Sequence, residues 1–137
     1  MTSNSRRIAA IDLGSNSFHL LLAEMVTRGG IESPRIIKRV KQKVRLADGF
    51  DASRNISQQG IDRAKACLSL FHDEIVQFGA GTIKAVATAA MRQANNQADV
   101  LQALEASLKF PIEIITGLRE AELIYAGVTS TARSRGD

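Results

Sequence analysis

The sequence predicts an α/β domain in which helices cover a mixed, five-stranded sheet. Three segments near the N-terminus are rich in aliphatic and β-branched residues, and only short turns separate them, which predicts a meander of antiparallel strands. From residue 57 onward, apolar residues recur at three- and four-residue spacing in segments that alternate with short apolar runs. A meander followed by helix–strand alternation is typical of a mixed sheet with helices packed against it.

The predicted meander consists of residues 8–13, 18–26 and 36–44. The first two segments are strongly apolar, and the short turn "GSNS" between them predicts a hairpin. The segment "TRGG" provides the next turn. The third strand, "IIKRVKQKV", mixes apolar with basic residues, which indicates that one of its sides faces solvent.

The first helix is expected to begin after Ser57, a favourable N-cap residue, and to end near residue 78 at the glycines of "GAG". The order of elements along the chain is then β-β-β-α-β-α-β-α. The later elements are, in order, a strand at 82–90, a helix at 97–108, a strand at 112–116 and a helix at 117–128.

The composition limits the class of protein and its partners. A chain of 137 residues is most simply one domain, and its net charge of +4 favours anionic partners such as phosphate esters, nucleic acid or acidic lipid. Single-stranded nucleic acid is disfavoured because the chain has five Phe, one Tyr and no Trp for stacking. The only cysteine, Cys67, excludes an internal disulfide and suggests a reducing, cytoplasmic compartment. No apolar run is long enough to span a membrane.

The hairpin turn "DLGSNS" is the main functional candidate. Asp12 ends a buried strand, where a carboxylate is costly unless it is paired, and Mg²⁺ would satisfy it. Gly14 lets the backbone approach a ligand closely, and the small polar residues after it add hydrogen-bonding groups without bulk. The alternative is an ordinary hairpin turn in which Asp12 bonds to backbone groups.

The segment "AAIDLGSNSFHLLLAE" resembles the first phosphate-binding hairpin of the exopolyphosphatase / guanosine pentaphosphate phosphatase (Ppx/GppA) family. Three further segments match in the same order: "KQKVRLADG", "ATAAMRQA" and "PIEIITGLREAELIYAGV". The resemblance covers residues 7–128. That family belongs to the actin, sugar-kinase and Hsp70 superfamily, so the resemblance implies a ribonuclease H-like (actin-like) domain.

The resemblance also implies a reaction, which is release of the terminal phosphate from inorganic polyphosphate or guanosine pentaphosphate with Mg²⁺ as cofactor. By the match to the family's "G-x-E-E-A" motif, Glu120 is the catalytic residue that orients and deprotonates water. Arg119 replaces the first Glu of that motif, and its role stays open. The other implied site residues are Asp12 on the metal side and Gly14, Ser15, Asn16, Ser17 and Arg92 as phosphate ligands.

Three other features keep alternatives. The basic residues Lys41, Lys43 and Arg45 form either a solvated strand face or a track for a polyanion. His19 matches the family's "SFH" and is expected to be a packed or hydrogen-bonded structural residue. Cys67 is expected to be structural, because no His or second Cys accompanies it.

The resemblance implies that residues 1–129 are the first phosphate-binding domain of a two-domain core and that 130–137 are a linker toward the second domain. The second domain would carry the opposing phosphate hairpin, so this fragment alone is expected to be inactive. The full-length protein is expected to be a homodimer without membrane or specific nucleic-acid partners. A non-catalytic module that binds polyphosphate or an alarmone is the main alternative, and a kinase of the same superfamily is less favoured.

Overall fold

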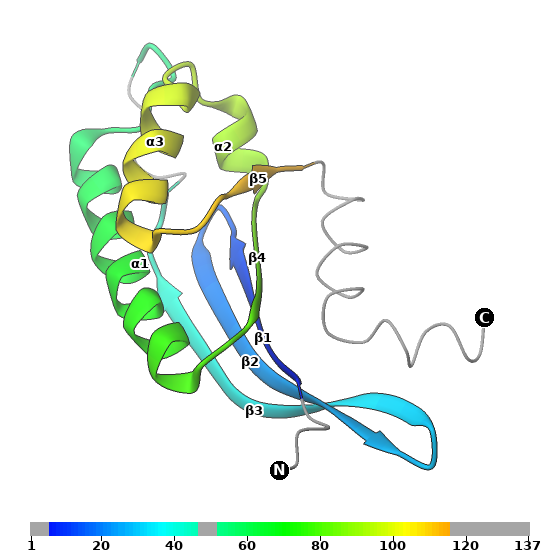
Figure 1. Cartoon of the computed structure of the whole chain (residues 1–137). Coiled ribbons are helices and arrows are strands. Elements are labelled where there is room, and N and C mark those ends of the chain that lie inside the picture. The colour runs from blue at the N-terminus through cyan, green and yellow to red at the C-terminus, as the bar shows by residue number, and fades with distance from the viewer. Residues whose placement is uncertain (1–5, 47–51, 116–137) are drawn as a thin grey trace.

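The computed structural model describes residues 6–46 and 52–115, and these residues form the predicted α/β domain with a mixed five-stranded sheet. The sheet has the strand order β3-β2-β1-β4-β5 (Figure 1). The elements are β1 (Arg6–Leu13), β2 (Ser17–Arg28), β3 (Ile31–Lys43), α1 (Gln58–Phe78), β4 (Thr82–Ala87), α2 (Ala89–Gln93), α3 (Gln97–Leu108) and β5 (Glu113–Ile114).

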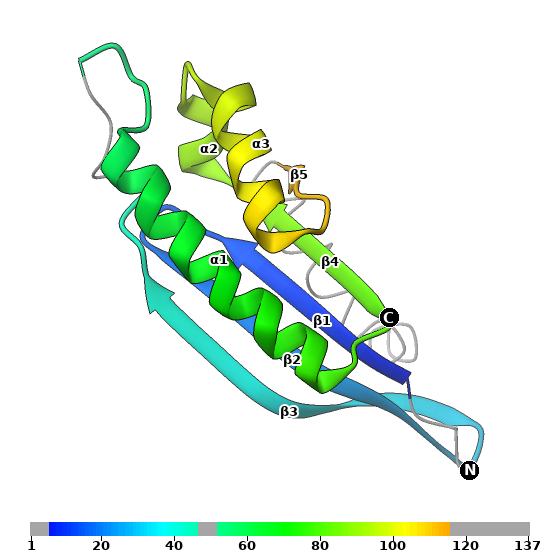
Figure 2. The same ribbon diagram turned by 60° about the vertical axis from the view of Figure 1, so that its left-hand side comes forward.

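The pairing of the strands confirms the meander and the mixed sheet. β1 pairs antiparallel with β2, and β2 pairs antiparallel with β3. β4 returns beside β1 in parallel, and β5 lies parallel to β4. The helices α1 and α3 lie side by side on one face of this sheet, as Figure 2 shows. Among the described helices, none combines the length and the apolarity that a bilayer crossing requires.

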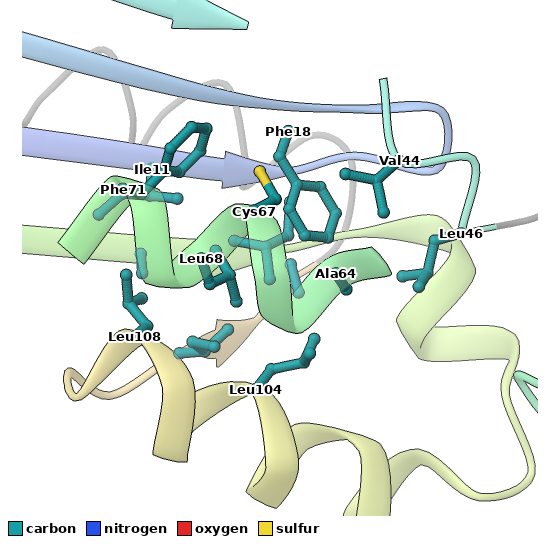
Figure 3. Close-up of a cluster of buried hydrophobic side chains, with 14 of the residues drawn as sticks. Ile11, Phe18, Val44, Leu46, Ala64, Cys67, Leu68, Phe71, Leu104 and Leu108 are labelled. Atoms are coloured by element: carbon teal, nitrogen blue, oxygen red, sulfur yellow. The ribbon is translucent and has the colours of Figure 1, made fainter. Parts of the chain in front are cut away.

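The main core lies between this face and the two long helices (Figure 3). Ile11 and Phe18 project from the hairpin strands and meet Phe71 of α1, which is fully buried. Successive side chains of a strand point to opposite faces of the sheet, and the alternate residues of β1 and β2 form a second, smaller cluster on the other face. Both faces of β1 therefore contribute buried side chains. This second cluster consists of Ile8, Ala10, Ala23 and Met25, with Leu21 packed against it.

The ends of α1 follow the sequence prediction. The Ser57 hydroxyl accepts a hydrogen bond from the Gly60 amide at 3.1 Å, which satisfies one of the free amides of the first turn. Gly79 ends the helix with a φ of 77°, a left-handed conformation that glycine adopts without strain. Both boundaries were therefore encoded by local capping residues.

The fourth strand was predicted too long. β4 ends at Ala87, and Ala89–Gln93 forms the short helix α2 instead of continuing the strand to residue 90. β1 ends at Leu13, so no neighbouring strand remains for residues beyond Ala87. The following "AAM" consists of good helix formers, and a short apolar run does not by itself distinguish a strand from a helix.

Cys67 is a buried core residue, as expected. It lies on the inner face of α1 beside Phe18, and burial raises the pKa of its thiol to about 12. The thiol is therefore protonated at physiological pH and is unsuited to nucleophilic chemistry.

Glu24 is a nearly buried carboxylate that ties β2 to its two neighbours. Its Oε1 accepts a hydrogen bond from Arg35 of β3 at 2.7 Å, and its Oε2 accepts one from Arg7 of β1 at 3.2 Å. Arg7 also donates to the Phe78 carbonyl at 2.7 Å, so the network reaches the C-terminal end of α1. The hydrogen bond from Arg35, and then the second arginine, hold the pKa of Glu24 below its usual value.

We expect Glu24→Gln to lower the free energy of unfolding at neutral pH and to leave it nearly unchanged in acid. A carboxylate with a depressed pKa in the folded state stabilises the fold above its unfolded-state pKa, and this contribution is lost as the pH falls through the folded-state pKa. Urea titrations at pH 7 and at a pH below the folded-state pKa of Glu24 measure the difference. The matched control is Glu74→Gln in the exposed pair with Lys38, where a smaller change is expected. If Glu24→Gln lowers the free energy of unfolding by the same amount at both pH values, this prediction is contradicted.

Candidate phosphate-binding site

The candidate site lies at the edge of the sheet where β1, β4 and β5 end. The Thr88 amide donates to the Leu13 carbonyl at 3.4 Å, and the Ile115 amide donates to the Ala87 carbonyl at 2.9 Å. These bonds bring the ends of three parallel strands together. Open α/β sheets bind ligands at this carboxyl edge, so the hairpin turn after β1 occupies a favourable position.

The turn itself has amides available for a ligand. The Gly14 amide donates to the Ser17 carbonyl at 3.1 Å, which closes the turn and leaves Ser15 and Asn16 at its tip. The amides of Ser15 and Asn16 donate to no protein group within the described residues. Asn16 is exposed and Ser15 is partly exposed, so both amides lie where an anion can approach them.

Gly14 is required by packing within the turn. A Cβ atom at this position would lie 2.9 Å from the Ser17 carbonyl oxygen, which is closer than real Cβ contacts allow. Ser17 differs from the other turn residues because it is buried and begins β2 opposite Lys43. Its predicted contact with phosphate stays a prediction.

Asp12 lies in the middle of the sheet, paired with His19 of β2 on one side and with Val86 of β4 on the other. Its Oδ1 atom is buried. Asp12 and His19 line a cavity of about 420 Å³ on the sheet face opposite α1, together with the side chains of Arg39 and Lys41. His19 is exposed, so it is not packed in the core, and a structural hydrogen bond from this histidine stays a prediction.

The residues around Asp12 fit a magnesium ion that retains most of its water. Among the described residues, no cluster of three His, Cys, Asp or Glu side chains could enclose a metal. Mg²⁺ commonly uses only one or two carboxylates together with waters and phosphate oxygens of the substrate. A single carboxylate beside a turn with available amides therefore fits this ion better than it fits a fully protein-ligated one.

The basic residues of β3 lie beside the turn. Lys43 is the register partner of Ser17, and Lys41 is the partner of His19. Within the described part of the chain, neither lysine forms an ion pair, whereas Lys38 on the opposite side of β3 pairs with Glu74 at 2.8 Å. Lys41 and Lys43, the lysines beside the turn, therefore have no carboxylate partner among the described residues.

Arg92 lies on α2, next to the same edge of the sheet. Its NH1 group donates to the Ile115 carbonyl at 2.6 Å, so it holds the backbone at the end of β5. The side chain is exposed, and a guanidinium keeps other donors for a phosphate. The predicted catalytic Glu120, the last helix at 117–128 and the linker 130–137 lie outside the described residues.

A second contact to the turn was not predicted from the sequence. The Asn16 carbonyl accepts hydrogen bonds from two successive amides, those of Val44 at 3.0 Å and Arg45 at 2.8 Å. Arg63 of α1 donates to the carbonyls of the same two residues. These contacts join backbone groups that are far apart in the chain, and no pattern of residue types predicts such contacts.

Comparison with known proteins identifies the family. The model of the Ppx/GppA phosphatase family matches residues 25–137. The chain belongs to the Ppx/GppA phosphatase family. A Haemophilus influenzae protein provisionally named an exopolyphosphatase is 41% identical over 133 residues, which cover 97% of this chain and 40% of that protein.

Solved Ppx/GppA structures share the fold. The Aquifex aeolicus PPX-GPPA enzyme superposes with a TM-score of 0.75 at 28% identity, over 85% of this chain and 38% of that one. An exopolyphosphatase from Cytophaga hutchinsonii gives a TM-score of 0.77 at 30% identity, over 89% and 38% of the two chains. The present Ppx/GppA chain thus has the actin-like, ribonuclease H-like fold, and it spans about 40% of the length of the relative that it matches.

Proposed function

We propose that this Ppx/GppA chain forms one half of the phosphate site of an enzyme that hydrolyses the terminal phosphoanhydride bond of polyphosphate, of guanosine pentaphosphate, or of both. The observation that carries the proposal is the turn at residues 14–17. Its two tip amides face no described acceptor, and it lies at the carboxyl edge of the sheet beside lysines that form no ion pair with any described residue. Family membership supports the same class of reaction.

In this proposal the amides of Ser15 and Asn16 bind oxygens of the phosphate chain and hold the terminal group in place. Glu120 orients a water molecule and accepts its proton as the water oxygen bonds to the terminal phosphorus. The bond between that phosphorus and the bridging oxygen breaks, and its electron pair stays with the shortened chain. Such a transfer depends mainly on positioning and charge stabilisation, which the turn and the nearby guanidinium of Arg92 would supply.

Asp12 would hold Mg²⁺ through its carboxylate, partly by way of water. When bound, the ion would neutralise charge on the phosphate oxygens. Asp12 is suited to this role because it projects into the cavity beside the turn, with its Oδ1 atom buried. The opposing phosphate loop, and with it most of the activity, would come from a second domain, while a homodimeric state and a cytoplasmic location are further predictions.

The test is phosphate release by the full-length protein from polyphosphate and from guanosine pentaphosphate, with and without Mg²⁺. We expect release that depends on Mg²⁺ from at least one substrate, and little or none from residues 1–137 alone. Tight binding without release by the full-length protein would instead support a non-catalytic binding module. Transfer of the phosphoryl group to a sugar or to acetate would support a kinase.

We expect Lys43→Met to raise KM for polyphosphate about two- to fivefold, because an exposed charge near a polyanion contributes about 0.5–1 kcal/mol. The effect should shrink at high salt, which screens exposed charges. Lys38→Met is the matched control, since Lys38 lies on the same strand but pairs with Glu74 on the helix side. Equal KM values for the two variants would indicate that the basic residues beside the turn are only a solvated face.

A further inference from the structure

The turn at residues 14–17 is joined to the segment after β3 through one carbonyl group, that of Asn16. The Asn16 carbonyl oxygen accepts from the Val44 amide at 3.0 Å and from the Arg45 amide at 2.8 Å. Two successive amides thus converge on one oxygen, and the chain turns directly after them, where Arg45 has a φ of 56° in the left-handed region. The peptide between Asn16 and Ser17 is therefore fixed from the side of the segment that follows β3.

That segment is in turn held by a side chain of α1, Arg63. Arg63 Nε donates to the Val44 carbonyl at 2.9 Å, and its NH2 group donates to the Arg45 carbonyl at 3.2 Å. Arg63 has no ion pair within the described residues. Its guanidinium thus binds the backbone of the same two residues whose amides bind the turn.

The geometry suits arginine in particular. A guanidinium presents forked donors that can reach two neighbouring carbonyls at once, whereas a lysine ammonium is a point charge without a fixed fork. The supporting segment is also anchored by packing, because Val44 and Leu46 are both buried and Val44 lies beside Phe18 (Figure 3). Arg63 itself projects from a helix whose inner face is packed in the main core, so the donor is attached to a rigid element.

We propose that Arg63 is a positioning residue for the phosphate-binding turn. It acts through Val44 and Arg45 on the Asn16 carbonyl, and so sets the orientation of the tip amides toward an anion. The inference rests on the proposed function, because it assumes that these amides bind phosphate. It adds a residue from α1, outside the hairpin, to the determinants of phosphate affinity.

A positioning role differs from a purely structural one in what it changes. If Arg63 only joined α1 to the strand end, its loss would lower the thermal midpoint and leave anion affinity intact in the folded protein. If it orients the turn, anion affinity falls even at temperatures far below unfolding. The amides of Val44 and Arg45 should also exchange their hydrogens faster, because their segment loses its anchor.

The experiment measures binding of inorganic tripolyphosphate to the full-length protein by calorimetry, alongside the thermal midpoint and amide exchange. We expect Arg63→Met to weaken binding about tenfold, the size expected for losing a charged donor that sets the site. Arg63→Lys should recover only part of the affinity, because it cannot span both carbonyls. Should the Met variant fail to fold, the Lys variant carries the comparison.

Two controls separate the possible explanations. Lys65→Met removes an exposed charge from the same helix and should leave binding unchanged. Leu104→Ala destabilises the core away from the turn and should lower the thermal midpoint with unchanged affinity. Unchanged tripolyphosphate affinity in both Arg63 variants would overturn this inference alone. If the wild-type protein binds no tripolyphosphate at the turn, the proposed function fails together with it.

Discussion

Glu120→Gln should lower the rate of phosphate release by the full-length protein about 10²–10⁴-fold, the usual contribution of a positioned general base. Glutamine has nearly the same shape as glutamate and can still orient water, but it cannot accept the proton at neutral pH. We therefore expect the loss to fall on kcat, with KM for polyphosphate little changed. Steady-state phosphate release across a substrate series measures both constants.

The matched control for Glu120 is Glu113→Gln. Glu113 is an exposed carboxylate of β5, a few residues earlier in the same segment, and its side chain lies 3.7 Å from Lys84. This change removes one negative charge close to the same edge of the sheet and should alter the rate little. A Glu120→Gln enzyme that retains its rate would rule out this residue as the base and leave the assignment to another group.

Gly14→Ala should reduce kcat/KM for polyphosphate on the order of 10²-fold. The added methyl group would lie 2.9 Å from the Ser17 carbonyl oxygen, which is a backbone atom and cannot turn aside as a side chain could. The hairpin would have to open, and the bond from the Gly14 amide to that oxygen would be distorted. Displacement of binding groups by about 1 Å can cost this much in rate.

Gly81→Ala is the control for this substitution. A Cβ at Gly81 meets no atom within 4 Å, and the backbone there is not left-handed, so alanine should be accepted with unchanged kinetics. Thermal midpoints of both variants show how much of the Gly14 effect comes from stability. If Gly14→Ala hydrolyses polyphosphate normally, the turn does not bind the phosphate chain in the proposed way.

The sequence predicted those elements that local chemistry determines. The helix at 58–78 was found from its apolar spacing and its capping residues, and the hairpin was found from two apolar runs around small polar residues. The end of β4 was missed because it depends on where β1 ends, which is a matter of pairing between distant segments. The start of β3 at Ile31 was missed similarly, since the segment "ESPR" that follows it is not typical of a strand and is extended only by pairing with β2.

The candidate site also has a part that local sequence predicts and a part that depends on contacts between distant segments. The position of the turn and of Asp12 followed from the hairpin, and Lys43 was noted as basic without any sign that it lies opposite Ser17. The contacts of Arg63 could not be predicted, because it donates to backbone carbonyls, which every residue type presents alike. Arg92 likewise contacts the Ile115 carbonyl, which any amino acid at that position would present.

The central place of β1 has a consequence for how a ligand would be captured. This strand is bonded on one edge to β2 and on the other to β4, so its amides should be among the slowest in the molecule to exchange with solvent. Asp12 stands on that strand and therefore has little freedom to shift. Any closing movement during ligand capture must then be made by other parts of the protein, which would move toward this fixed strand.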